Sequence, residues 1–108
     1  MKIQFPVDTV IDTDAYNEID DQFAISYLLS HGESLRTVAL YAAPFFNSNS
    51  ASPADGMEKS YNELSHILTL AGREDLFQFS YRGSDRYLPD EHTPVISDAP
   101  HCDIPAGL

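Results

Sequence analysis

The chain has 108 residues, of which 43% are hydrophobic and 21% charged, and its formal net charge is -11. This length suits one small domain, and the hydrophobic content is that of a globular protein and not of a disordered chain. Six Lys and Arg against 17 Asp and Glu argue against binding to a nucleic-acid backbone or to an anionic membrane surface.

The N-terminal residues do not resemble a signal peptide. A single Lys2 precedes a short apolar stretch that Pro6 and Asp8 interrupt. No apolar run approaches the roughly 20 residues needed to span a bilayer. Cys102 is the one cysteine in the sequence, so no disulfide can form within the chain. We therefore expect a cytoplasmic protein without a membrane partner.

The first two predicted elements are a strand and a helix. Val7 to Asp12 is rich in β-branched residues and has the length of a strand. Residues 18–31 are predicted to form a helix, with Asn17 as its N-cap, acidic residues in its first turn and Gly32 as its C-terminal cap. The predicted apolar face of this helix contains Ile19, Phe23, Ile25, Tyr27, Leu28 and Leu29.

The next predicted elements are a strand, a polar loop and a longer helix. Thr37 to Ala42 is almost continuously apolar, which is typical of a strand covered on both faces. After the loop Phe45 to Ser52, a capping box at Ser52 with Pro53 in the first turn predicts the start of a helix that ends at Gly72. Its apolar residues recur at helical spacing: Met57, Tyr61, Leu64, Leu68 and Ala71.

A third strand is predicted at Phe77 to Tyr81. Alternation of strands and helices indicates an α/β fold, with an open and mainly parallel sheet and helices flanking its faces. Residues 83–108 contain four prolines and no periodicity, so we expect an irregular tail there. Three strands are few for such a sheet, which suggests that the sequence is part of a longer domain.

Four aspartates surround the junction between the first strand and the first helix: Asp12, Asp14, Asp20 and Asp21. Open α/β sheets bind ligands at the carboxyl ends of their strands. Four carboxylates at that edge repel one another at neutral pH, and a helix terminus with about half a charge cannot balance them. Either raised carboxyl pKa values or a bound hard divalent cation would relieve the repulsion, and we favour the cation. Three or four carboxylates with room for water suit Ca²⁺ better than Mg²⁺.

An apolar strand ending in D-x-D, with D-D opening the next helix, resembles the calcium-dependent nucleoside hydrolases of the inosine-uridine-preferring type. Their usual form is DxDxxxDD after an apolar strand. Here five residues separate Asp14 from Asp20, and Ala15-Tyr16 replaces the usual Pro-Gly. The resemblance extends from Val7 to about Ala99 and implies a nucleoside hydrolase-like fold with a Rossmann-like core.

The resemblance implies a role for each matching aspartate. Asp14 would ligate Ca²⁺ and orient or deprotonate the attacking water. Asp21 would be a second calcium ligand, and Asp12 would bind the ion or support the site. Asp20 would accept a hydrogen bond from a ribose hydroxyl. These roles imply a calcium cofactor and a nucleoside as the small-molecule substrate.

A further sugar contact is implied in the loop after the second strand, where Asn47 is the nearest candidate and Asn49 the next. Tyr16, between the aspartates, could stack on a base, although an ordinary half-buried tyrosine is the favoured interpretation. The implied reaction is hydrolysis of the N-glycosidic bond of ribonucleosides, of the kind used in purine and pyrimidine salvage. A metal that binds both water and ribose combines positioning with charge stabilisation.

Members of that family are about three times longer, so we interpret residues 1–108 as the N-terminal part of one nucleoside hydrolase-like domain. An exposed sheet edge favours association into a homo-oligomer. One alternative is a phosphatase of the haloacid dehalogenase type, which also has D-x-D after a first strand. It gives no reason for Asp20-Asp21, and its D-x-D normally continues into a small pair such as Gly-Thr. A calcium-binding fragment without catalysis is the other alternative.

Overall fold

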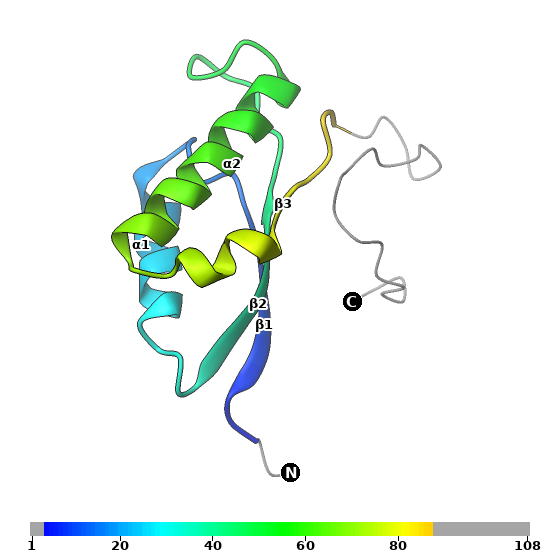
Figure 1. Ribbon diagram of the computed structural model, residues 1–108. Coiled ribbons are helices and arrows are strands. Elements are labelled where there is room, and N and C mark those ends of the chain that lie inside the picture. The colour runs from blue at the N-terminus through cyan, green and yellow to red at the C-terminus, as the bar shows by residue number, and fades with distance from the viewer. Residues whose placement is uncertain (1–3, 88–108) are drawn as a thin grey trace.

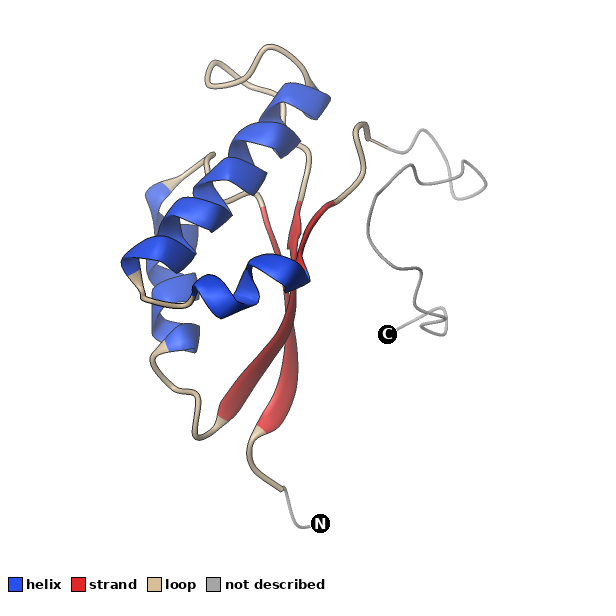
Figure 2. Ribbon diagram, in the orientation of Figure 1, coloured by secondary structure: helices blue, strands red, loops and turns tan. Residues whose placement is uncertain are grey.

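The computed structural model describes residues 4–87. In chain order the elements are β1 (Val7–Thr13), α1 (Ile19–Leu29), β2 (Leu35–Ala42), α2 (Pro53–Leu70), the 3₁₀-helix η1 (Glu74–Phe79) and β3 (Ser80–Arg82). The three strands form one sheet in the order β1-β2-β3, and both strand pairs are parallel (Figure 2). The predicted α/β class, the alternation of strands and helices, and the parallel sheet are confirmed.

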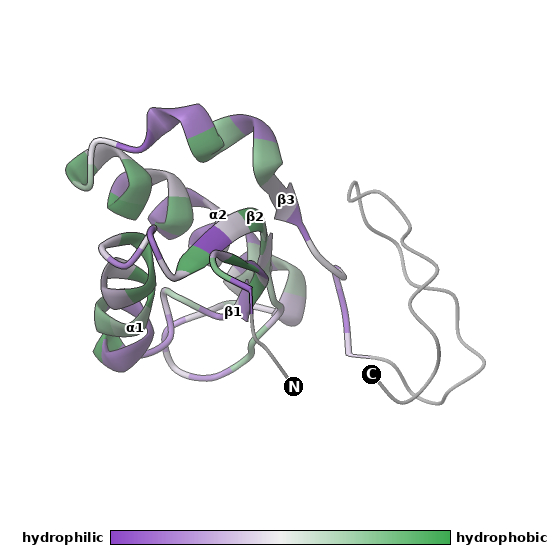
Figure 3. Cartoon of the chain, turned by 90° about the horizontal axis from the view of Figure 1, so that it is seen from below, coloured by the Kyte–Doolittle hydropathy of each residue, from purple (hydrophilic) through white to green (hydrophobic). Residues whose placement is uncertain are grey.

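All described helices lie on the same face of the sheet (Figure 1), and the view from below in Figure 3 agrees. The expectation of helices on both faces is wrong for residues 4–87, and the reason is topological. Crossovers between parallel strands are right-handed, so a chain that adds strands in one direction places every crossover on one face. On that face Ile11 and Leu40 are buried. Val10, which precedes Ile11 in β1 and points to the other face, is 55% exposed.

The helix α2 follows its sequence signals closely. The Ser52 hydroxyl accepts a hydrogen bond from the Asp55 backbone N–H at 3.0 Å, and Asp55 Oδ2 accepts one from the Ala51 N–H at 2.8 Å. These bonds satisfy donors that the first turn leaves without partners. At the other end Gly72 has a φ of 69°, and the Arg73 N–H donates to the Leu68 carbonyl at 2.8 Å. The predicted caps of this helix are therefore confirmed.

The helix α1 departs from its prediction at both ends. Its N-cap is Glu18, which makes no side-chain capping bond, and the predicted cap Asn17 hydrogen-bonds elsewhere. Its C-cap is Ser30 with right-handed backbone angles, so Gly32 is not the left-handed cap that was expected. Only part of the predicted apolar face is buried: Ile25 and Leu29 are buried and Leu28 is half-buried, whereas Ile19, Phe23 and Tyr27 are 66%, 69% and 63% exposed.

The third strand is shorter and later than predicted. Residues Glu74–Phe79 form the 3₁₀-helix η1, and β3 covers only Ser80–Arg82. The apolar residues of this segment pack in a 3₁₀-helix and not in a strand, and Leu76 is the one that is buried. The Ser80 hydroxyl donates to the Leu76 carbonyl at 3.2 Å and joins η1 to the strand.

The hydrophobic core lies between the sheet and its helices. Its buried members come from every described helix, from β1, β2 and the loop after β1: Ile11, Ala15, Ile25, Leu29, Leu40, Ala42, Met57, Leu64, Ile67, Leu68 and Leu76. Of the predicted tail 83–108, residues 83–87 contain no helix or strand, and the rest lies outside the described residues. In the described part of the chain, no helix is long and apolar enough to cross a membrane.

Candidate functional site

The carboxyl ends of the three parallel strands lie at one edge of the sheet, at the top of Figure 1. The loops that leave this edge are residues 14–18, 43–52 and 83–87. Two of them carry predicted site residues, Asp14 and Asn47. Parallel pairing therefore brings together segments that are about 30 residues apart in the sequence.

Asp12, Thr13 and Asp21 line a small hollow at the edge of β1 and α1, with a volume of about 270 Å³. Asp12 is exposed between the buried Ile11 and Thr13, so its side chain points to the opposite face of the sheet from the helices. The buried Thr13 hydroxyl donates to Asp21 Oδ2 at 2.6 Å, a short bond to a charged acceptor. This bond holds the first turn of α1 against the end of β1, so the Asp21 carboxylate stays beside the strand.

Burial raises the pKa of the Asp12 carboxyl above its ordinary value, and the negative charge of Asp14 raises that pKa further. The Asp14 carboxylate is therefore close enough to disfavour the charged form of Asp12. A bound cation would remove this penalty. The end of β1 therefore carries excess negative charge, as a cation site does.

The Asp14 carboxylate is held by a neighbouring amide. Asn17 Nδ2 donates to Asp14 Oδ2 at 2.9 Å, and the Asn17 backbone N–H donates to the Asp14 carbonyl at 2.8 Å. Asn47 Nδ2 in turn donates to Asn17 Oδ1. The structure therefore links the predicted sugar-contacting Asn47 to the predicted catalytic Asp14 through one intervening side chain. The other candidate, Asn49, contributes its backbone N–H to Asn47 Oδ1 at 2.7 Å.

Asp20 is exposed in the first turn of α1, where the helix dipole favours negative charge. Its Oδ1 accepts a bond from the Asp21 backbone N–H at 3.1 Å. The four aspartates do not close into one cluster: among residues 4–87, no three His, Cys, Asp or Glu side chains are grouped closely enough to hold a metal ion. What the described chain brings together is Thr13 with Asp21 by a hydrogen bond, and Asp12 with Asp14 electrostatically.

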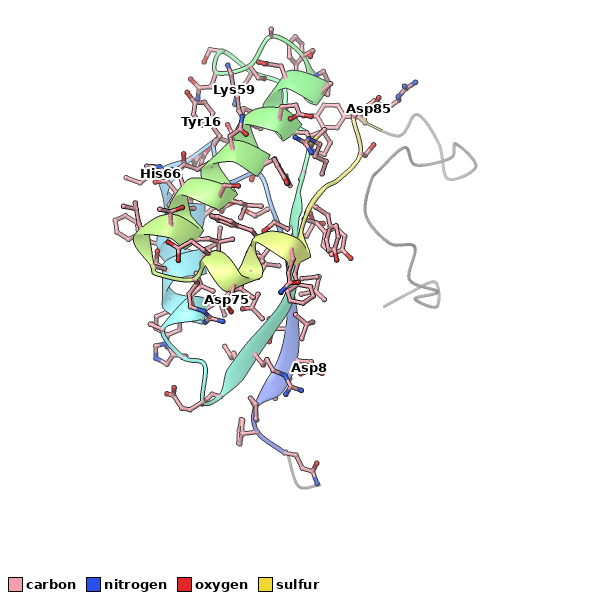
Figure 4. The ribbon with its side chains drawn as sticks, viewed as in Figure 1. Asp8, Tyr16, Lys59, His66, Asp75 and Asp85 are labelled. Carbon is pink, nitrogen blue, oxygen red and sulfur yellow. The ribbon has the colours of Figure 1, made fainter. Side chains whose placement is uncertain are left out.

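The loop that carries Asp14 is anchored in the core and on α2. Ala15 is fully buried, and the Tyr16 backbone N–H donates to the buried Ser60 hydroxyl at 3.3 Å. The Tyr16 ring packs 6.4 Å from the Phe45 ring, and Lys59 Nζ lies 5.6 Å from its centroid (Figure 4). Ala15-Tyr16 therefore has a packing role, and Tyr16 is a half-exposed aromatic residue held on α2.

No ion pair within residues 4–87 involves Asp12, Asp14, Asp20 or Asp21. The five Lys and Arg side chains in this range pair with other carboxylates: Arg36 with Asp8, Lys59 with Asp55, Arg73 with Asp75, Arg82 with Glu58 and Arg86 with Asp85. The basic residues thus neutralise other parts of the surface. The carboxylates at the end of β1 therefore have no basic side chain of residues 4–87 to balance their charge.

Two residues that support this region were not identified as site residues from the sequence. Thr13 holds Asp21, and its position between two aspartates was a usable signal, because a hydroxyl there can donate to a neighbouring carboxylate. Asn17 was interpreted only as a helix cap. Its amide bond to Asp14 could have been anticipated from their spacing of three residues, whereas its bond to Asn47 could not.

No protein-family model, curated protein or solved structure matches this chain.

Proposed function

We propose that the carboxyl edge of β1 carries part of a calcium site of the nucleoside hydrolase type, in a fold whose sheet is Rossmann-like. The proposed reaction is hydrolysis of the N-glycosidic bond of ribonucleosides. The main observation in its support is that Asp12 and Asp14 at the end of β1, and Asp21 held there by Thr13, pair with no basic side chain of residues 4–87. The D-x-D and D-D motifs, which resemble those of that family, supply the choice of substrate.

The donor types, carboxylate and amide oxygens, are those that Ca²⁺ takes, and the carboxylates of residues 4–87 would have to move closer together to hold the ion. Calcium takes six to eight oxygen ligands, and the described site offers carboxylates and amide oxygens but no sulfur or imidazole. The negative charge of Asp14, which with burial raises the pKa of Asp12, supports a cation at this position. Asp14, Asp21 and Asp12 would hold the ion. They supply only part of a full coordination shell, so the remaining oxygen ligands would be water, substrate hydroxyls or groups outside residues 4–87.

The proposed roles are those that the resemblance implies for each aspartate. Calcium, when bound, would supply positive charge that makes water more acidic and would hold the ribose hydroxyls. Asp14 is fixed through Oδ2 by Asn17, and its other oxygen would accept a proton from the attacking water. Asp20 is exposed in the first turn of α1 and would accept a hydrogen bond from a ribose hydroxyl. These contacts would orient the sugar for an oxocarbenium-like transition state.

The test is release of ribose from inosine and from uridine by the protein in the presence of Ca²⁺. Asp14→Ala should abolish release while leaving the far-UV circular dichroism spectrum unchanged. Asp75→Ala is the matched control, because Asp75 is an exposed aspartate that pairs with Arg73 away from this edge (Figure 4). Unaltered turnover in Asp14→Ala would overturn the assignment.

The same preparation should be given a phosphomonoester with Mg²⁺. Phosphate release that requires Mg²⁺ and Asp14 would replace the present proposal with a phosphatase of the haloacid dehalogenase type. Calcium binding without release of either product would identify a binding module. Each outcome leaves a different function standing.

A further inference from the structure

The loop residues 47–49 and the loop residues 14–17 are joined by a chain of three hydrogen bonds. The Asn49 backbone N–H donates to Asn47 Oδ1 at 2.7 Å, Asn47 Nδ2 donates to Asn17 Oδ1, and Asn17 Nδ2 donates to Asp14 Oδ2 at 2.9 Å. The participants come from two segments about 30 residues apart, which meet only because β1 and β2 are parallel neighbours.

The direction of this chain is fixed at both ends. A backbone N–H can only donate, so it selects the oxygen of the Asn47 side chain as its partner. An ionised carboxylate can only accept, so Asp14 selects the NH₂ group of Asn17. The two amides between these ends satisfy both requirements with a single orientation each. Turning either amide over would place two donors or two acceptors against each other.

The loop that supplies Asn47 is itself rigidly attached. Phe45 is 3% exposed, and the Ser50 hydroxyl donates to the Phe45 carbonyl at 2.9 Å. Lys59 Nζ, from α2, donates to the Asn49 carbonyl at 2.8 Å. On α2, Gly56 lies against the Phe45 backbone so closely that an added Cβ would be 2.1 Å from the Phe45 oxygen. Asn49, whose N–H is the first donor in this series of hydrogen bonds, therefore has a fixed position relative to the core.

We propose that Asn17 is a positioning residue for Asp14, and that Asn47 sets the orientation of Asn17. Asn17 engages one oxygen of the Asp14 carboxylate and leaves the other free for a cation or a reacting group. Partners of this kind, hydrogen-bonded to a ligating carboxylate, fix its orientation and its affinity for the metal. The inference rests on the proposed calcium site. It also gives Asn47 a task besides the sugar contact implied by the sequence.

Calcium titration calorimetry on the full chain tests the role of Asn17. Asn17→Ala should weaken Ca²⁺ binding about tenfold, the lower end of the effect usual for such partners. Asn47→Ala should weaken it less, because Asn17 keeps its direct bond to Asp14. The double variant should match Asn17→Ala, because Asn47 acts only through Asn17. Asn62→Ala is the matched control, since Asn62 is an exposed asparagine on α2.

The outcomes separate this inference from the proposed function. Unfolding midpoints equal to that of the wild type would show that the variants act on the site and not on the fold. If Asn17→Ala binds Ca²⁺ as tightly as Asn62→Ala, the positioning role is overturned and the calcium site stands. If additive losses are found in the double variant, Asn47 does not act through Asn17 and that part is overturned. If the wild type does not bind Ca²⁺, the proposed function is overturned, and the positioning role with it.

Discussion

The two α-helices of this molecule pack on the same face of the same sheet but differ in their caps and in how much of their surface is buried. α2 is capped at both ends by local bonds and buries Met57, Leu64, Ile67 and Leu68. α1 has no side-chain cap and buries only two residues, while three large apolar side chains spaced by four residues stay exposed. Its fixed point is the bond from Thr13 to Asp21.

The difference indicates that α2 is held by its caps and a long buried face, whereas α1 is held by two core residues and by side-chain bonds from Thr13 to Asp21 and from Gln22 to Glu63. Core packing is the main source of helix stability. Two side chains of α2 hold the neighbouring loops: the Ser60 hydroxyl accepts a bond from the Tyr16 N–H, and Lys59 donates to the Asn49 carbonyl. α1 presents Asp20 and Asp21 at the carboxyl edge of the sheet. Paired substitutions, one in each helix or its flanking residues, test this difference.

The largest contrast is expected in the buried faces. Leu64 on α2 is fully buried and Phe23 on α1 is 69% exposed. Leu64→Ala should lower the free energy of unfolding by about 2–5 kcal/mol, because it leaves a cavity in the core. Phe23→Ala should change it by less than about 0.5 kcal/mol. Urea denaturation of both variants measures the contrast, and an equal loss in Phe23→Ala would show that α1 has a packed partner in solution.

The C-terminal ends of the helices should differ next. Gly72 after α2 has a φ of 69°, so Gly72→Ala should lower the free energy of unfolding by about 1 kcal/mol. An added Cβ at Gly32 after α1 meets nothing within 4 Å, and that residue has no positive φ. Gly32→Ala should therefore be neutral or slightly stabilising. Thermal unfolding of the two variants would contradict this if Gly32→Ala were the more damaging.

The N-terminal caps give a smaller contrast. Ser52→Ala removes the acceptor for the Asp55 N–H and should cost about 1 kcal/mol or less of unfolding free energy. Glu18 caps α1 without a side-chain bond, so Glu18→Ala should stay within about 0.5 kcal/mol of the wild type. The measurement is the denaturant midpoint, at constant slope, for the two variants. A larger loss in Glu18→Ala would assign that carboxylate a bond that is absent from the described structure.

The smallest effect is a pH dependence confined to α2. The Ala51 backbone N–H, and after it Lys59, lower the pKa of the Asp55 carboxyl below its ordinary value of 3.8. A group whose pKa is lower in the folded state adds stability above its unfolded pKa and loses it as the pH falls through the folded value. Asp55→Asn should therefore have a lower denaturation midpoint than wild type at pH 6, and the difference should shrink below pH 4. A difference that stays constant down to pH 2 would contradict this assignment.

Features set by interactions between residues close in the sequence could be predicted, and those set by contacts between distant residues could not. The ends of α2 were predictable because Ser52, Pro53 and Gly72 act on their own turns. The η1 segment was missed because Phe77 and Phe79 suit a strand as well as a 3₁₀ turn, and only packing of Leu76 separates the two. The placement of all helices on one face needs the strand order, which no local pattern contains.

The aspartates of the proposed site were found because they are neighbours in the sequence, but their support was not. Asn17 looked like a helix cap, since asparagine before an acidic turn is a common cap. Its use is decided by Asn47, 30 residues away, which the sequence does not place beside it. The hollow lined by Asp12 and Asp21 likewise depends on how α1 packs against β1.

The central claim is that Asp14, Asp21 and Asp12 bind Ca²⁺, and nuclear magnetic resonance of the side-chain carboxyl carbons during a calcium titration tests it most directly. The carboxyl signals of these three residues should shift together and saturate, while that of the exposed Asp75 in η1, which pairs with Arg73, should not. Equal, unsaturated shifts of all aspartates, or no shift at Asp14 and Asp21, would contradict it.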